Sequence, residues 1–171
     1  MARVQAYQGF VSAHGSLSRE QFLAKVTAPH LFFPKLPDLE TIEAFTTIQI
    51  TPGAARGALG HSFGQAGIIA IAKDSANAFG MMITMGRAPN NDLIVPDKRV
   101  SKFHAYFREL GGKWSITDAN STNGTKVDGE RVAPNASLGL TSGCAIELSG
   151  AIPVRFFAPP DLYAHIHAAK V

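Results

Sequence analysis

The order of apolar and polar positions predicts a helical beginning, followed by many short strands. Ser18 and Gln21 have the spacing of a capping box, in which each side chain bonds the other residue's backbone N–H. They predict a helix over residues 19–27, and Pro29 prevents its continuation. A second amphipathic stretch at residues 161–170 predicts a short helix near the other end.

From residue 67 onward, β-type runs alternate with turn residues. Gly111-Gly112 and Asp128-Gly129 are typical of tight hairpin turns. Many short strands at close spacing favour an all-β sandwich of two antiparallel sheets. The predicted strands are Ile68–Lys73, Met81–Met85, Leu93–Val95, Ala105–Leu110, Lys113–Asp118, Lys126–Val127, Arg131–Val132, Ala145–Leu148 and Ile152–Phe157.

The segment that joins the first helix to these strands is irregular. Residues 31–37 are apolar but interrupted by Pro34, so they cannot form a regular helix. Their phenylalanines would be costly to leave in water, and we expect the segment to pack along another surface. Residues 41–51 read as an extended arm or strand, and the glycine- and alanine-rich residues 53–67 as a linker.

Composition and charge bear on the partners and the compartment that we expect. The chain has 171 residues and a formal net charge of +3 that is not gathered into a run, so it suggests neither nucleic acid nor membrane as a partner. Cys144, the only cysteine, lies in an apolar run and reads as a small core residue. Because the sequence shows no leader and no membrane-length apolar run, we expect a cytoplasmic protein.

Three short motifs follow one another between residues 86 and 125. They are Gly86-Arg87, then Ser101-Lys102-Phe103-His104, then Ser121-Thr122-Asn123-Gly124-Thr125. A guanidinium, a hydroxyl and an amide on turns can surround a phosphate dianion and a strand of peptide backbone. Nothing in the set is equipped to activate water or attack a carbon, so the motifs indicate binding and not an enzyme.

The order and spacing of these motifs resemble the forkhead-associated (FHA) domain, a family that reads phosphothreonine. The resemblance covers about residues 67–158 and includes residues outside the three motifs. It implies an FHA-type β-sandwich of two antiparallel sheets, preceded by a small helix-containing extension. The additional matching positions are Trp114, Ile116, Asp118, Leu138, Gly143, Ile146 and Leu148, with Asn120 as a polar position before the third motif.

The resemblance also implies a role for each residue of the motifs. Arg87, Ser101 and Thr122 would contact the phosphate, and Asn123 would bond the backbone of the bound peptide. The residues that would support the loops without touching the ligand are Gly86, His104 and Gly124.

The resemblance also bears on two basic residues in or near the second motif. Lys102 replaces the usual Arg or Asn, and its ammonium can reach a phosphate but cannot hold it bidentately. Arg99 lies in the loop that reads the third residue after phosphothreonine, where it would favour an acidic side chain. The alternative is that Arg99 is simply solvated.

These observations predict an organisation and a function. Residues 1–66 would form the extension, 67–158 the FHA domain and 159–171 a tail. The expected function is a phosphothreonine-dependent adaptor in Ser/Thr kinase signalling, without cofactor or metal, whose partner is a kinase or its substrate. The alternative is a phosphate-independent assembly protein that keeps the sandwich as a scaffold. A subsidiary hypothesis is an intramolecular partner, in which Thr46, Thr47 or Thr51 of the 41–51 arm is phosphorylated and folds back into the pocket.

Three catalytic or metal signals are weaker. Gly60-His61-Ser62-Phe63-Gly64 fits the nucleophile elbow of hydrolases, but no buried strand precedes it. His165 and His167 have the spacing of half a metal site, without further ligands nearby. Ser101 with His104 lacks an orienting carboxylate in its motif.

Overall fold

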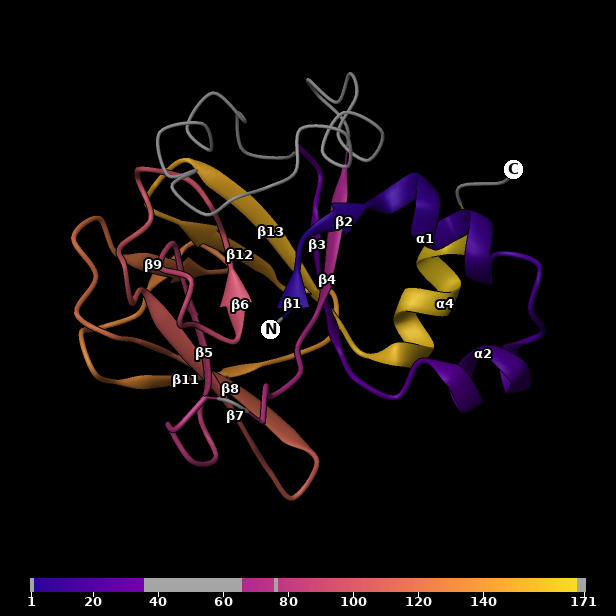
Figure 1. The fold of residues 1–171 in the computed structure, drawn as a ribbon, viewed down its shortest axis with the longest axis horizontal. Helices are drawn as coiled ribbons and strands as arrows, with labels where there is room; N and C mark the ends of the chain where they lie inside the picture. Colours follow the sequence, from indigo (N-terminus) through magenta and orange to yellow (C-terminus); the bar gives the residue numbers. More distant parts are fainter. Residues whose placement is uncertain (1, 36–65, 76, 169–171) are drawn as a thin grey trace.

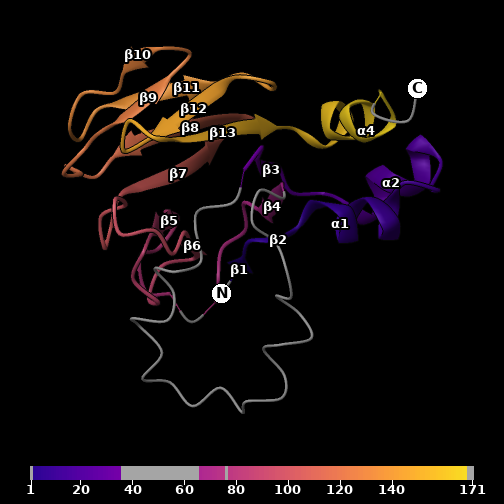
Figure 2. The ribbon, with the colours of Figure 1, turned by 90° about the horizontal axis from the view of Figure 1, so that it is seen from above.

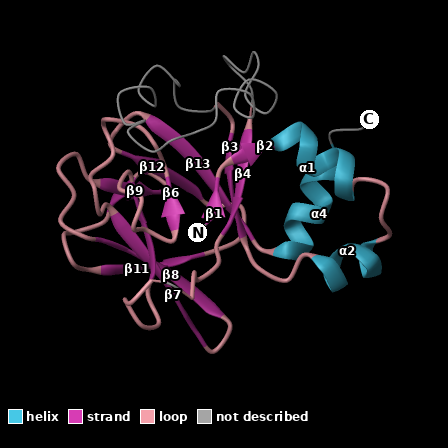
Figure 3. Cartoon of the chain, viewed as in Figure 1, coloured by secondary structure: helices cyan, strands magenta, loops and turns pink. Residues whose placement is uncertain are grey.

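The computed structural model describes residues 2–35, 66–75 and 77–168, which form a two-sheet sandwich with helices at one end (Figures 1 and 3). One sheet has the strand order β1-β6-β5-β7-β8-β11, and the other has the order β10-β9-β12-β13-β3-β4-β2. Neighbouring strands are antiparallel, except that β6 pairs in parallel with β1 and β5. The predicted all-β sandwich is confirmed.

The bounds of the elements are as follows. The first sheet contains β1 (Ala2–Arg3), β5 (Ile83–Gly86), β6 (Leu93–Ile94), β7 (Ala105–Leu110), β8 (Lys113–Asp118) and β11 (Ser137–Leu140). The second contains β2 (Gln5–Ala6), β3 (His30–Phe33), β4 (Gly67–Ala70), β9 (Thr125–Val127), β10 (Glu130–Arg131), β12 (Ala145–Leu148) and β13 (Ile152–Phe157). The helices are α1 (Tyr7–His14), α2 (Arg19–Lys25) and α4 (Pro159–Ala168).

Strand β3 lies inside the second sheet, between β13 and β4, and is covered on both faces. Leu31 and Phe33 point into the core between the two sheets, whereas Phe32 packs among the helices on the outer face. A strand that is covered on both faces reads as a continuous apolar run, which is why residues 31–33 show no alternation. We expected this segment to pack along another surface, and its described part does so as a strand inside the second sheet.

The helices form a third layer against the outer face of β13, β3 and β4. Figure 2 shows α1, α2 and α4 gathered at the end of the sandwich where β2, β3 and β4 lie. Their buried side chains share one cluster with Ile68 of β4 and Phe157 of β13. Ile69 and Phe156, the sequence neighbours of these two residues, point into the other core, as strand alternation requires.

The capping box at the start of α2 is confirmed. The Gln21 N–H donates to Ser18 Oγ over 3.2 Å, and the Ser18 N–H donates to Gln21 Oε1 over 3.1 Å. The helix ends at Lys25, two residues before the predicted end. Helix α1 was not predicted, because its N-cap residue, Ala6, has no side chain that can cap the helix.

Residues on both sides of the expected boundary at 66/67 contribute to the same sandwich. β1 joins one sheet, and β2 and β3 join the other. The division into an extension, a domain and a tail therefore stays a prediction. In the structure, the described parts of these regions pack together. The 41–51 arm, most of the 53–67 linker and the Gly60–Gly64 motif lie outside the described residues.

Within the described ranges, each helix is too short or too polar to cross a lipid bilayer.

The buried His30 predicts a loss of stability in acid. Burial lowers its pKa from 6.5 to about 4, while its Nδ1 bonds the Ala28 carbonyl over 2.9 Å and nearby His14 opposes a positive charge. Between pH 6.5 and 4 the unfolded chain binds a proton that the folded chain excludes. The free energy of unfolding should therefore fall by about 2–3 kcal/mol over this window.

Denaturant unfolding at several pH values measures this effect. The variant His30→Phe preserves an aromatic contact with Phe10, whose ring centroid lies 5.2 Å from that of His30, but has no proton to bind. It should lose the part of the slope that His30 contributes between pH 6.5 and 4, whereas the buried His104, whose pKa is also lowered, keeps its own contribution. An unchanged slope in His30→Phe would contradict the assignment.

Candidate functional site

The residues singled out in the sequence lie on three loops at one end of the first sheet. Arg87 begins the loop between β5 and β6, and Ser101 lies in the loop between β6 and β7. Thr122 and Asn123 lie in the loop between β8 and β9. The backbone joins the first two loops, because the Arg87 N–H donates to the Ser101 carbonyl over 3.0 Å.

Gly86 allows these two loops to approach each other. A Cβ built on Gly86 would lie 2.3 Å from the Lys102 carbonyl oxygen, which is closer than any side chain tolerates. That carbonyl accepts the Ala88 N–H over 3.2 Å and the Asn91 Nδ2 over 2.7 Å. The position therefore requires glycine for a steric reason, and Arg87 owes its place beside Ser101 to this contact.

His104 supports the second loop from inside. The ring is fully buried, its backbone N–H donates to the Met85 carbonyl over 2.8 Å, and Nδ1 accepts the Ser101 N–H over 3.2 Å. Burial lowers the pKa of His104, against the opposing influence of Asp118 and of the Gly124 backbone. A neutral ring that accepts at Nδ1 carries its proton on Nε2, so His104 orients Ser101 without facing solvent.

Asp118 organises the third loop. Its carboxylate accepts the Ser121 N–H, the Ser121 hydroxyl and the Thr125 hydroxyl, each over 2.7 Å. Burial alone would raise the pKa of Asp118, but the hydrogen bonds from Thr125 and Ser121 outweigh it and lower the pKa. Gly124 then turns the chain at a φ of +81° and donates its N–H to Ser121 Oγ over 3.0 Å.

The hydroxyls of the second and third loops are in contact. The Thr122 N–H donates to Ser101 Oγ over 3.0 Å, and Ser101 Oγ donates to Thr122 Oγ1 over 3.3 Å. Ser101 is half-buried, whereas Thr122 is exposed. Two residues that are 21 positions apart thus present their hydroxyls together at the surface, beside the backbone of Arg87.

The Arg99 carbonyl joins a further pair of side chains. Asn123 Nδ2 donates to it over 2.9 Å, and Ser149 Oγ donates to it over 2.8 Å. Ser149 follows β12 and holds a φ of +59°, an uncommon value for a serine. The turn after β12 is therefore part of the same loop cluster.

The guanidinium of Arg99 forms an ion pair within its own loop. Its Nη2 lies 2.6 Å from Asp97 Oδ2, and its Nε donates to Asp97 Oδ1 over 2.9 Å. The hydrogen bond from Arg99 lowers the pKa of Asp97. A buried carboxylate thus holds the side chain that we expected to read an acidic residue of the ligand.

The structure brings together most of the predicted site. Hydrogen bonds link Ser101 with Thr122 and, separately, Asn123 with the Arg99 carbonyl. Arg87 joins the first pair through its backbone N–H, which donates to the Ser101 carbonyl. Lys102 is exposed and contributes its carbonyl to the contact with Gly86. The sequence analysis missed Asp97 and Ser149, although Asp97 follows Pro96 in a turn-like context where an Asp–backbone bond is common.

No group of three or more His, Cys, Asp or Glu that could hold a metal ion occurs among the residues that the structure describes. Both histidines of the His165-x-His167 pattern pack against aromatic rings. The His165 ring stacks on Phe157 at a centroid distance of 4.7 Å, and the His167 ring lies 4.0 Å from that of Tyr163.

Comparison with known proteins identifies the matching part of the chain. Residues 83–149 match the family model of the FHA domain. The oxoglutarate dehydrogenase inhibitor of Corynebacterium diphtheriae is 38% identical over 65 residues, which cover 38% of this chain and 43% of that protein. The glycogen accumulation regulator GarA of Mycolicibacterium smegmatis is 35% identical over 88 residues, covering 48% and 54%. The chain spans about half the length of these curated relatives.

Solved structures agree with the fold. The N-terminal FHA domain of Saccharomyces cerevisiae Rad53p, in complex with a phosphothreonine peptide, matches with a TM-score of 0.50 and 18% identity over 81% of this chain and 98% of that one. An FHA domain of Arabidopsis thaliana matches with a TM-score of 0.50 and 20% identity over 77% and 85%. At these identities the likeness concerns the sandwich alone.

The steric role of Gly86 is testable by unfolding. Gly86→Ala should lower the free energy of unfolding by about 1–3 kcal/mol, because the new methyl group must push the Lys102 backbone away. Gly139→Ala is the matched control, since a Cβ at Gly139 in β11 meets nothing within 4 Å. Its effect should stay within about 0.5 kcal/mol. Equal effects of the two substitutions in denaturant unfolding would contradict the steric argument.

Proposed function

Because residues 83–149 match the family model of the FHA domain, we propose that the chain is a phosphothreonine-dependent binding protein in Ser/Thr kinase signalling. The observation that carries this proposal is the contact between Ser101 and Thr122 beside Arg87. The hydroxyls of Ser101 and Thr122 and the loop that carries Arg87 therefore lie together at the surface. These are the donors that a phosphate with nearly two negative charges requires.

Each site residue has a role in this proposal. Arg87 binds the phosphate oxygens through its guanidinium fork, and Ser101 and Thr122 donate their hydroxyls. The amide of Asn123 donates to the Arg99 carbonyl through Nδ2, so its Oδ1 is oriented to accept a peptide N–H. Lys102 adds a positive charge at the rim. The role is binding and not catalysis, and we place it in the cytoplasm, where the partner is a kinase or its substrate.

The alternative of phosphate-independent assembly needs an exposed docking face, for which the apolar residues of the N-terminal half are the candidates. In the described part of that half, Phe22, Leu31 and Phe33 are fully buried within this chain. They support the sandwich and offer no face to a partner. The 41–51 arm, whose threonines were candidate intramolecular ligands, lies outside the described residues.

The phosphate dependence is tested by Arg87→Ala. A hydrogen bond to a charged group contributes about 1.5–3 kcal/mol, so affinity for a degenerate phosphothreonine peptide library should fall about ten- to a hundredfold. Arg87→Lys should recover part of the loss, because it restores the charge without the fork. Arg19→Ala on α2 removes the same charge far from the loops and should change nothing. Fluorescence anisotropy with phosphorylated and dephosphorylated peptides measures these affinities.

Two results would refute the proposal. One is equal binding of phosphorylated and unphosphorylated peptides. The other is partner capture that survives both phosphatase treatment and Arg87→Ala, which would favour the assembly alternative.

The ion pair between Asp97 and Arg99 predicts the selectivity of the site. While Asp97 holds the guanidinium, an acidic residue at the third position after phosphothreonine gains little. Asp97→Asn keeps an acceptor for the Arg99 N–H but removes the charge. Preference for an acidic over an alanine residue at that position should rise by about five- to tenfold, which is about 1 kcal/mol. Peptide arrays that vary only this position give the comparison, and an unchanged ratio would show that Arg99 does not read it.

A further inference from the structure

A row of stacked side chains lies on the surface next to the phosphate-binding loops. Its members are Phe79, Phe103, Tyr106 and Arg108, which we call the aromatic strip. The ring centroids of Phe79 and Phe103 are 5.7 Å apart, and those of Phe103 and Tyr106 are 6.2 Å apart, with interplanar angles of 12° and 14°. The Arg108 guanidinium carbon lies 5.1 Å from the centroid of the Tyr106 ring and extends the row.

The strip is exposed to solvent. Phe79 is 46% exposed and Phe103 is 36% exposed, although both side chains are large and apolar. The alternation of β7 directs Tyr106 and Arg108 outward, because Ala105 and Phe107 occupy the core. Exposed aromatic rings with a neighbouring arginine are the side chains most enriched at protein interfaces.

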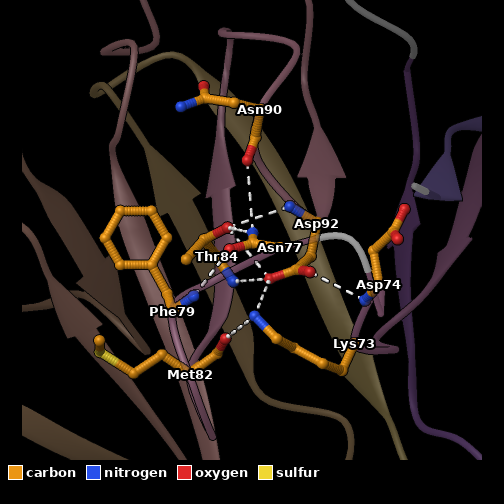
Figure 4. A network of polar contacts seen from close by, with 8 residues as sticks. All are labelled: Lys73, Asp74, Asn77, Phe79, Met82, Thr84, Asn90 and Asp92. Carbon is orange, nitrogen blue, oxygen red and sulfur yellow. Dashed lines mark hydrogen bonds and ion pairs between the residues drawn. The ribbon is translucent and has the colours of Figure 1, made fainter.

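A polar network that reaches the buried Asp92 holds the backbone of Phe79, at one end of the strip (Figure 4). The Phe79 N–H donates to Asn77 Oδ1 over 3.1 Å, and Asn77 Nδ2 donates to Thr84 Oγ1 over 2.8 Å. Thr84 in turn donates its N–H to the carboxylate of Asp92 over 2.7 Å, and Asp92 is fully buried. The backbone that carries Phe79 is thus fixed to β5 before any ligand arrives, and preorganisation of this kind favours binding.

The strip is continuous with the proposed phosphate site. Phe103 stands two residues after Ser101, between exposed Lys102 and buried His104. From Phe103 to Arg108 the chain advances about 17 Å at the rise of a strand. About five or six residues of an extended peptide would cover that length.

We propose that the aromatic strip binds a second part of the same partner chain, a segment beside the phosphothreonine that carries apolar or aromatic side chains with acidic neighbours. This inference rests on the function proposed above. The rings of Phe79, Phe103 and Tyr106 take the apolar side chains. Lys102 at one end and Arg108 at the other provide the charge that selects acidic residues.

Such a segment adds affinity because it is tethered to the phosphothreonine. Once the phosphate is bound, a short linker gives the second segment a high effective concentration at the strip. Loss of the strip should therefore lower affinity about tenfold and leave the dependence on phosphate intact.

The experiment uses the full chain and a phosphothreonine peptide library with eight randomised residues on each side of the fixed phosphothreonine. Selected peptides are measured against Phe103→Ser, Phe79→Ser and the control Leu110→Ser, with thermal unfolding to verify each fold. Leu110 is a stringent control, because it is 81% exposed and shares the outward face of β7 with Tyr106 and Arg108 but stands beyond the last member of the strip.

We expect apolar and acidic residues to be enriched more than four positions from the phosphothreonine. Phe103→Ser and Phe79→Ser should each bind these peptides about tenfold more weakly, whereas Leu110→Ser should bind like the unmodified chain. Peptides shortened to three residues on each side should bind all of these proteins equally.

Phosphate-dependent binding that is unchanged in both phenylalanine variants, or equally weakened in Leu110→Ser, would overturn this inference while leaving the proposed function intact. Binding without any phosphate dependence would instead refute the proposed function, and this inference with it. A concentration-dependent dimer in sedimentation velocity that Phe103→Ser abolishes would assign the strip to a second copy of the chain and overturn the proposal.

Discussion

The loops of the candidate site depend on one steric constraint, which is the approach of the Lys102 backbone to Gly86. The Lys102 carbonyl occupies the space that a side chain at residue 86 would fill, and this draws the loops after β5 and β6 together. Arg87 and Ser101 become hydrogen-bonded neighbours as a direct result. His104 beneath the second loop and Asp118 beneath the third then fix the hydroxyls that face solvent. Buried contacts beneath the loops therefore position the polar groups of this surface.

The sandwich provides a buried scaffold, and the loops provide exposed polar groups. Two separate apolar clusters hold the sheets and the helical layer, and the second sheet is shared by both clusters. On the first sheet, β7 directs Tyr106 and Arg108 of the aromatic strip outward, away from the core. A scaffold that is buried on one side and open on the other keeps the loops rigid and leaves a surface for partners.

The sequence predicted those features whose signal is local. Strands β7, β8, β12 and β13 have the predicted bounds, because alternation and turn residues mark both ends. The capping box marked α2 in the same way. Strand β3 was not recognised as a strand because burial on both faces removes alternation, and α1 was missed because Ala6 carries no cap.

For the candidate site, too, the sequence predicted the local motifs. The three motifs lie on loops that touch, and Ser101 meets Thr122, as the proposed contact of both residues with one phosphate requires. The ligand contacts themselves stay predictions. What the sequence could not supply were partners chosen by tertiary structure, such as Asp97 for the Arg99 guanidinium and Ser149 for its carbonyl.

The position of β3 in the second sheet has a consequence for the folding of the chain. β3 pairs on one side with β13, where Phe32 lies opposite Arg155, a residue near the other end of the sequence. During synthesis, the first helices and β3 have no complete sheet to join until β13 has left the ribosome. Closing so long a loop is entropically costly and slows folding. The early apolar residues, Phe22 and Phe33 among them, therefore lack part of their final packing until β13 has been synthesised.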